Sequence, residues 1–139
     1  LWLVVPLLLV VSRPGYVLAW ALPLVARRSL ARRWNRSRLS SVWRPIDTLI
    51  HSPVGALVIS TAVVWLWHAP FLYEAALRNQ VVHWLEHATF LAAFTVFWTV
   101  VAAPLGRRRA DGGTAALLLF GQSVQGSALG ALLVFSPVA

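Results

Sequence analysis

The sequence predicts an all-α protein, a polytopic bundle of transmembrane helices with about three full spans and a partial first one. Three observations lead to this prediction. Hydrophobic residues make up 59% of the 139-residue chain, and only four carboxylates occur in it. The apolar residues come in blocks of about twenty, the length that a helix needs to cross a bilayer. Proline, glycine and arginine separate these blocks, as expected of connections between spans.

The first apolar block, residues 1–12, is too short to cross a bilayer as a helix, and it indicates the end of a truncated span. Residues 16–26 contain Pro23 and favour a short interfacial or broken segment. One kinked span over residues 1–26 is the alternative, which Arg13 in its middle disfavours.

Three full spans are expected next, at residues 46–67, 81–103 and 114–135. Residues 68–80 should form a short connection between the first two of them. Residues 1–139 are therefore interpreted as a single membrane domain. Because the chain opens at Leu1 in the middle of an apolar run, we expect it to be a piece of a longer protein.

The arginines predict the orientation in the membrane. Seven of them lie within residues 27–44 and three more at 107–109, whereas the connection 68–80 contains only Arg78. Basic loops favour the cytoplasmic side, so residues 27–45 are expected to form a basic cytoplasmic loop and residues 68–80 to lie on the outer side.

Within that loop, Leu30, Trp34 and Leu39 are spaced among the charges, which favours a short amphipathic helix on the lipid surface. The formal net charge of +8 is thus attributed to topology and to contacts with anionic membrane lipid, and not to nucleic-acid binding.

The candidate functional site is a cluster of histidines at the predicted outer side. His83 and His87 are four residues apart, so they share one face of a helix, and Glu86 adjoins that face. His68 ends the preceding span, at about the height of His83. Ionisable groups are costly in lipid and mark function, and imidazoles gathered there suit a copper or zinc ion. Glu86 is either a ligand or a partner that orients a histidine ring.

The same histidines allow other interpretations. His68 alone would be an ordinary interfacial histidine, and His51, toward the basic side, is given no shared role. The spacing of His83, Glu86 and His87 also matches the inverted zincin signature of zinc proteases, for which Glu74 could supply a third ligand. A haem held by histidines from opposing helices is a further possibility, which would make the chain a haem-carrying or structural membrane subunit.

Several other residues carry weaker predictions. An aromatic belt is expected at the outer membrane surface, from Trp65, Trp67, Tyr73 and Trp84. Polar Gln122 and Gln125 in the last span should face protein or water and line the metal cavity. The motif Gly126-x-x-x-Gly130 favours close helix packing within the same bundle, with a homo-oligomer as the alternative. Cysteine and methionine are absent, which excludes sulfur ligands.

Taken together, these segments resemble the CtaG family of cytochrome c oxidase assembly factors. The resemblance covers roughly residues 1–137, and its most specific part is residues 67–98. It is carried by Trp67-His68-Ala69-Pro70, by His83-Trp84-Leu85-Glu86-His87, by Phe97-Trp98 and by Leu129–Pro137.

The resemblance implies a multi-pass protein of the bacterial inner membrane, with about seven helices, that helps to insert copper into the oxidase. By that similarity His68, His83 and His87 would be copper-site residues, and a cytochrome c oxidase subunit would be the partner. A further histidine pair of the family, on an earlier helix, does not occur in this chain. We therefore expect a protein that binds or passes copper and is not an enzyme.

Overall fold

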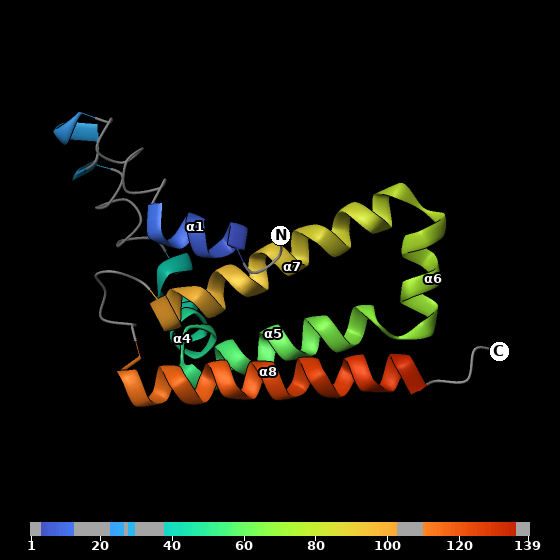
Figure 1. Ribbon diagram of the computed structural model, residues 1–139. Helices are drawn as coiled ribbons and strands as arrows, with labels where there is room; N and C mark the ends of the chain where they lie inside the picture. The colour runs from blue at the N-terminus through green and yellow to red at the C-terminus, as the bar shows by residue number, and fades with distance from the viewer. Residues whose placement is uncertain (1–3, 13–22, 27, 30–37, 103–109, 136–139) are drawn as a thin grey trace.

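The structure is a computed structural model that describes residues 4–12, 23–26, 28–29, 38–102 and 110–135. These residues form helices and no strand, in agreement with the predicted all-α class. The helices that can be bounded within the described residues are, in chain order (Figure 1), α1 (Val4–Ser12), α4 (Arg38–Ile50), α5 (Pro53–Trp67), α6 (Pro70–Arg78), α7 (Gln80–Ala102) and α8 (Gly112–Phe135).

Two of the described helices, α7 and α8, are each long and apolar enough to cross a membrane. They confirm the spans expected at 81–103 and 114–135 to within two residues. Polar side chains define where both begin. Asn79 Oδ1 accepts a hydrogen bond from the backbone N–H of Val81 at 2.8 Å, and Asp111 Oδ1 accepts one from Thr114 at 3.0 Å. Such caps satisfy N–H groups that have no partner within the helix.

The span expected over residues 46–67 is not one straight helix, and that prediction was wrong in this respect. Helices α4 and α5 meet at an angle of 77°, so together they count as a third span only if the bent pair is one span. Pro53 is the first residue of α5, and the residue before a proline is driven out of the helical region. Ser52 accordingly adopts φ −73° and ψ 154°.

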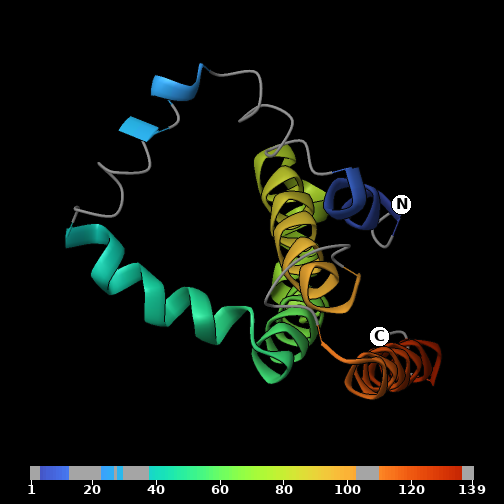
Figure 2. The same ribbon diagram turned by 90° about the vertical axis from the view of Figure 1, so that its left-hand side faces the viewer.

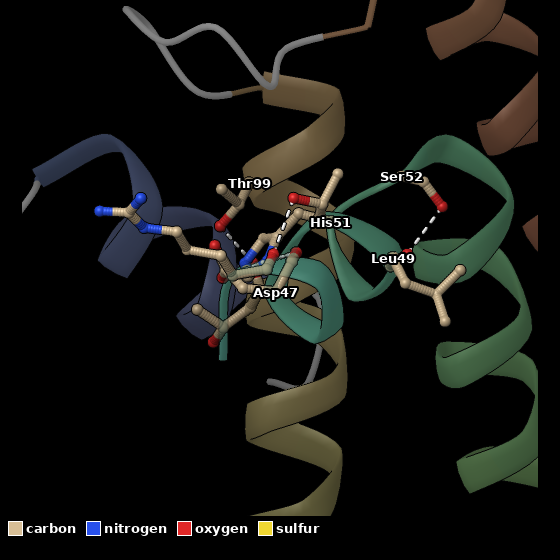
Figure 3. Close-up of polar contacts among 8 residues, drawn as sticks. Asp47, Leu49, His51, Ser52 and Thr99 are labelled. Carbon is tan, nitrogen blue, oxygen red and sulfur yellow. Dashed lines mark hydrogen bonds and ion pairs between the residues drawn. The ribbon is translucent and has the colours of Figure 1, made fainter. Parts of the chain in front are cut away.

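The Ser52 side chain stabilises this break from both sides. Its hydroxyl donates to the carbonyl of Leu49 at 2.7 Å (Figure 3). The same hydroxyl accepts from the N–H of Gly55 at 2.9 Å. A second view of the molecule shows α4 leaving the bundle at the start of α5 (Figure 2). The chain thus changes direction at the start of α5, the end that follows the arginine-rich residues 27–44.

The connection expected at residues 68–80 contains a helix, α6, that was not predicted from the sequence. Pro70 occupies its first turn, where a missing N–H costs nothing, and Ala69 before it is extended. Arg78 donates to Glu74 at 3.0 Å one turn away, on an exposed face. Helix α6 bridges the end of α5 and the start of α7, so these two helices run antiparallel (Figure 1).

The core lies along α7. Helices α5 and α1 pack against it most extensively, and α8 runs beside α5 (Figures 1 and 2). One buried cluster joins the first half of α5, the second half of α7 and the first half of α8; it contains Ala56, Phe97, Val100, Val101 and Leu118. The other cluster joins the end of α5, α6 and the first half of α7; it contains Trp67, Ala76, Phe90 and Phe94. The first cluster packs the start of α5 against the end of α7, and the second packs the end of α5 against the first half of α7.

Helix α8 is much less buried than α7, the other helix of membrane length. Gly121 faces Leu57 of α5, where an added Cβ would lie 3.4 Å from the leucine side chain. Gly126 and Gly130, in contrast, have no atom within 4 Å of such a Cβ. The expectation that this glycine pair packs within the bundle is therefore wrong for the part of the chain that the structure describes.

Two predictions lie wholly or largely outside the described residues: the interfacial segment 16–26, and the placement of Leu30 and Trp34 on a surface helix. Helix α4 begins at Arg38, within the segment 27–45 that was expected to be a basic loop.

Candidate metal centre

The first two turns of α7 bring three potential metal ligands together. His83, Glu86 and His87 each offer one nitrogen or oxygen atom, and these three atoms lie within 4.8 Å of one another. The rings of His83 and His87 are stacked edge to face, with centroids 4.4 Å apart and planes at 72°. Because Asn79 caps the helix four residues before His83, the cluster lies at the very end of the span.

This geometry is close to what one ion requires. Two ligand atoms at the usual 2.0–2.1 Å from a metal are at most about 4.2 Å apart. A small rotation of an imidazole about its side-chain torsions would close the remaining gap from 4.8 Å. Glu86 and His87 are half-buried, so they are partly desolvated while the end of the helix remains accessible.

His68 faces the same place from α5. It is the C-terminal cap of that helix, and its Nδ1 lies 2.7 Å from the carbonyl of Val64, an acceptor that requires the proton on Nδ1. The other ring nitrogen, Nε2, is then the one with a lone pair for a metal. His68 lines a cavity of about 340 Å³ together with Glu86 and His87, and Val64, Phe90 and Phe94 complete its wall.

The four predicted ligands therefore occupy one end of the molecule but are not equally close. His83, Glu86 and His87 form the close group, and His68 contributes to the wall of the adjoining cavity without belonging to that group. A four-ligand site would require the α5 end to approach the first turns of α7.

Two residues that were not predicted from the sequence to belong to the site connect its two helices, α5 and α7. The indole N–H of Trp67 donates to the hydroxyl of Thr89 at 2.8 Å, and that hydroxyl also lies 2.8 Å from the carbonyl of Glu86. Trp67 is next to His68, and Thr89 is three residues after Glu86. The sequence could have indicated Thr89, because it lies one turn after the candidate ligand Glu86 and a threonine in a helix bonds to carbonyls of the preceding turn.

Trp67 was expected in the aromatic belt, and that prediction was wrong. Its side chain is 6% exposed, whereas Trp65, Tyr73 and Trp84 are 40%, 52% and 71% exposed. The bond to Thr89 explains the difference, since a buried indole N–H needs an acceptor.

His51 and Glu74 both lie away from this group of ligands. His51 is at the opposite end of α5, where its Nδ1 is 3.1 Å from a carboxylate oxygen of Asp47 (Figure 3). Glu74, the possible third ligand of a zinc protease, pairs with Arg78 on α6 and does not belong to the close group.

Gln122 and Gln125 do not line the cavity of His68, contrary to the expectation from the sequence. They line a neighbouring cavity between α5, α7 and α8. The Ser60 hydroxyl lies 3.0 Å from Gln122 and Trp65 donates to Gln125 at 2.9 Å, so both glutamines join α8 to α5.

Neither the curated proteins nor the solved structures contain a match to this chain. The family model for cytochrome c oxidase caa3 assembly factors, in contrast, matches residues 1–139, the whole of the sequence. With its membrane-length helices and its histidine-bearing helix ends, this chain belongs to the caa3-type cytochrome c oxidase assembly factor family.

Proposed function

We propose that this protein binds copper at His68, His83, His87 and Glu86 and helps to deliver it to a cytochrome c oxidase subunit. The close approach of the His83, Glu86 and His87 ligand atoms carries the proposal. Imidazole nitrogen suits copper, and the chain has no sulfur ligand to offer instead. In this proposal copper is the cargo of the protein.

The shape of the site supports transfer in preference to storage. The ligands lie at a helix end beside a cavity, and Trp84 and Leu85 between the two histidines are 71% and 56% exposed. His68 on α5 would complete the coordination when copper enters. An ion held by a close group on one helix and a fourth ligand on another can be released by separating the two.

The proposed setting is the bacterial inner membrane, with the site near the extracytoplasmic face. The arginines of residues 27–44 and 107–109 support this orientation, because basic segments are retained in the cytoplasm. Helix α6 and the histidines would then face the compartment from which copper reaches an oxidase.

Metal analysis of the full-length protein purified in detergent tests the proposal. We expect bound copper in the wild type, a loss of at least tenfold in affinity for His83→Ala and for His87→Ala, and a smaller loss for Glu86→Gln. His51→Ala is the matched control, because His51 is also a half-buried histidine but lies at the other end of α5. Cells that carry His83→Ala should accumulate oxidase with too little copper.

The same preparation separates the alternatives. Bound zinc together with peptide cleavage that Glu86→Gln abolishes would identify a metalloprotease instead. A haem absorbance band that disappears in His68→Ala and in His87→Ala would identify a haem-carrying subunit. Copper binding unchanged in His83→Ala and His87→Ala would overturn the proposed site.

A further inference from the structure

A second cavity lies deeper in the bundle, between α5, α7 and α8. It has a volume of about 380 Å³, within the range of small-molecule sites. Val64 and Phe94 line both this cavity and that of His68, so the two are neighbours. The deeper one contains no residue proposed to bind copper, and it is a different site.

The wall combines flat apolar surfaces with two primary amides. Three aromatic rings of α7 line it, those of Phe94, Phe97 and Trp98, and α8 contributes Gln122 and Gln125. These glutamines are the eleventh and fourteenth of the 24 residues of α8, at the middle of the span. Polar side chains at that depth are costly in lipid and mark binding sites or pathways.

The hydrogen bonds of the glutamines determine what they offer. An indole N–H can only donate, so its partner in Gln125 must be the carbonyl oxygen Oε1, at 2.9 Å from Trp65. Gln125 is thereby left with an amino group, for which no acceptor occurs among the residues that the structure describes. Gln122 lies 3.0 Å from the Ser60 hydroxyl, whose single proton also has the Ala56 carbonyl at 2.9 Å, so this contact does not fix the orientation of the Gln122 amide.

We propose that this cavity binds an uncharged, lipid-soluble molecule with a flat ring that bears carbonyl oxygens, a molecule of the quinone class. Amino groups select an acceptor, and the membrane interior disfavours a charged one. Trp98, the one of the three aromatic side chains that is partly exposed, would stack on the ring. A carbonyl oxygen would accept a hydrogen bond from the amino group of Gln125.

A pair of glycines allows a sharp test. Gly126 and Gly130 both have open space where a side chain would begin, but only Gly126 lines the cavity. Gly126→Leu should therefore fill the cavity, and Gly130→Leu is the matched control on the same helix. Gln125→Leu removes the amino group while it retains the size of the side chain.

The experiment titrates decylubiquinone into nanodiscs that contain the full-length protein and follows tryptophan fluorescence. We expect saturable quenching, with affinity at least tenfold weaker in Gly126→Leu and in Gln125→Leu and unchanged in Gly130→Leu. Should Gly126→Leu fail to fold, the loss in Gln125→Leu decides the result alone.

Three results would overturn the proposal: quenching that does not saturate, equal affinities in Gly126→Leu and Gly130→Leu, or equal affinities in Gln125→Leu and the wild type. Dioctanoylglycerol competing as well as the quinone would also overturn it, since an ester lipid has carbonyl groups but no ring. Copper binding should be unchanged in all three variants, which keeps this test separate from that of the metal site.

Discussion

At the scale of single residues, Thr89 connects the two helices that bear the histidines. Its hydroxyl accepts from the buried indole of Trp67 on α5 and lies within hydrogen-bond distance of the Glu86 carbonyl on α7. One short side chain thus relates the position of His68, next to Trp67, to that of Glu86. We therefore expect this contact to help set the geometry of the proposed copper site.

Thr89→Val should destabilise the fold and weaken copper binding together. The substitution preserves the shape but leaves the Trp67 indole, in a side chain 6% exposed, without its acceptor. Such an unsatisfied buried donor costs about 1–3 kcal/mol. Thermal unfolding in detergent measures the first effect and copper titration the second. Thr95→Val is the control, because the Thr95 hydroxyl bonds to the carbonyl of Leu91 on its own helix; equal effects of both substitutions would contradict the role of Thr89.

Asp111 provides a pH-dependent cap for α8. The pKa of its carboxyl group lies below the ordinary 3.8, first because the Thr114 hydroxyl donates to it and next because the Thr114 backbone N–H does so. A lowered pKa means that the cap is fully present above pH 3.8 and is lost as the pH falls through the folded-state value. The amide NMR signal of Thr114 should titrate with a midpoint below 3.8 and should not titrate in Asp111→Asn. A midpoint at or above 3.8 would show that the carboxylate is not held by these bonds.

At the scale of helices, the break between α4 and α5 is the most specific feature. Ser52 and Pro53 end one helix and begin the next, and Gly55 lies close against the backbone carbonyl of Leu49. A side chain on residue 55 would collide with that carbonyl. The 77° bend therefore requires a glycine one turn into α5.

Gly55→Ala should open the bend and cost about 1–3 kcal/mol, as overpacking usually does. The distance between spin labels on α4 and α5 measures the angle, and thermal unfolding measures the cost. Gly126→Ala is the control, because nothing lies within 4 Å of an added Cβ there. At that position alanine should be neutral or stabilise the helix by up to about 1 kcal/mol. A bend unchanged in Gly55→Ala would show that the contact with Leu49 does not define it.

At the scale of the whole molecule, the described helices have two distinct ends. Helix α6, the start of α7 and the end of α8 lie at one end, and α4 and the start of α8 lie at the other (Figure 1). His68, His83 and His87 belong to the first of these ends. The basic segments 27–44 and 107–109 flank the second end in the sequence. The charge distribution therefore predicts which end faces the cytoplasm.

Because the chain has no cysteine, single cysteines can report this orientation without background. Tyr73→Cys on α6 should react with a membrane-impermeant maleimide in intact spheroplasts, since residue 73 is 52% exposed at the histidine end. Asp111→Cys, at the start of α8, should react only after the membrane is permeabilised. The reverse pattern would place the histidines in the cytoplasm and contradict delivery of copper from outside.

Much of the architecture follows from the sequence alone. Blocks of apolar residues determine the helices α7 and α8, and the four-residue spacing of His83 and His87 places both on one face. The short link between His68 and His83 makes their helices neighbours. These features are local, because helix length, helix periodicity and the length of a connection depend only on residues close in the chain.

Only the tertiary structure decided which side of each helix turns inward. In α5, α7 and α8 the apolar residues surround the whole helix, so no polar face marks the side that meets lipid. The burial of Trp67, the separate cavity of Gln122 and Gln125 and the open face of Gly126 and Gly130 all depend on that choice. Lipid and a protein core are equally apolar, so hydropathy does not distinguish a lipid-facing side of a helix from a protein-facing one. Packing and hydrogen bonds between helices decide which side turns inward.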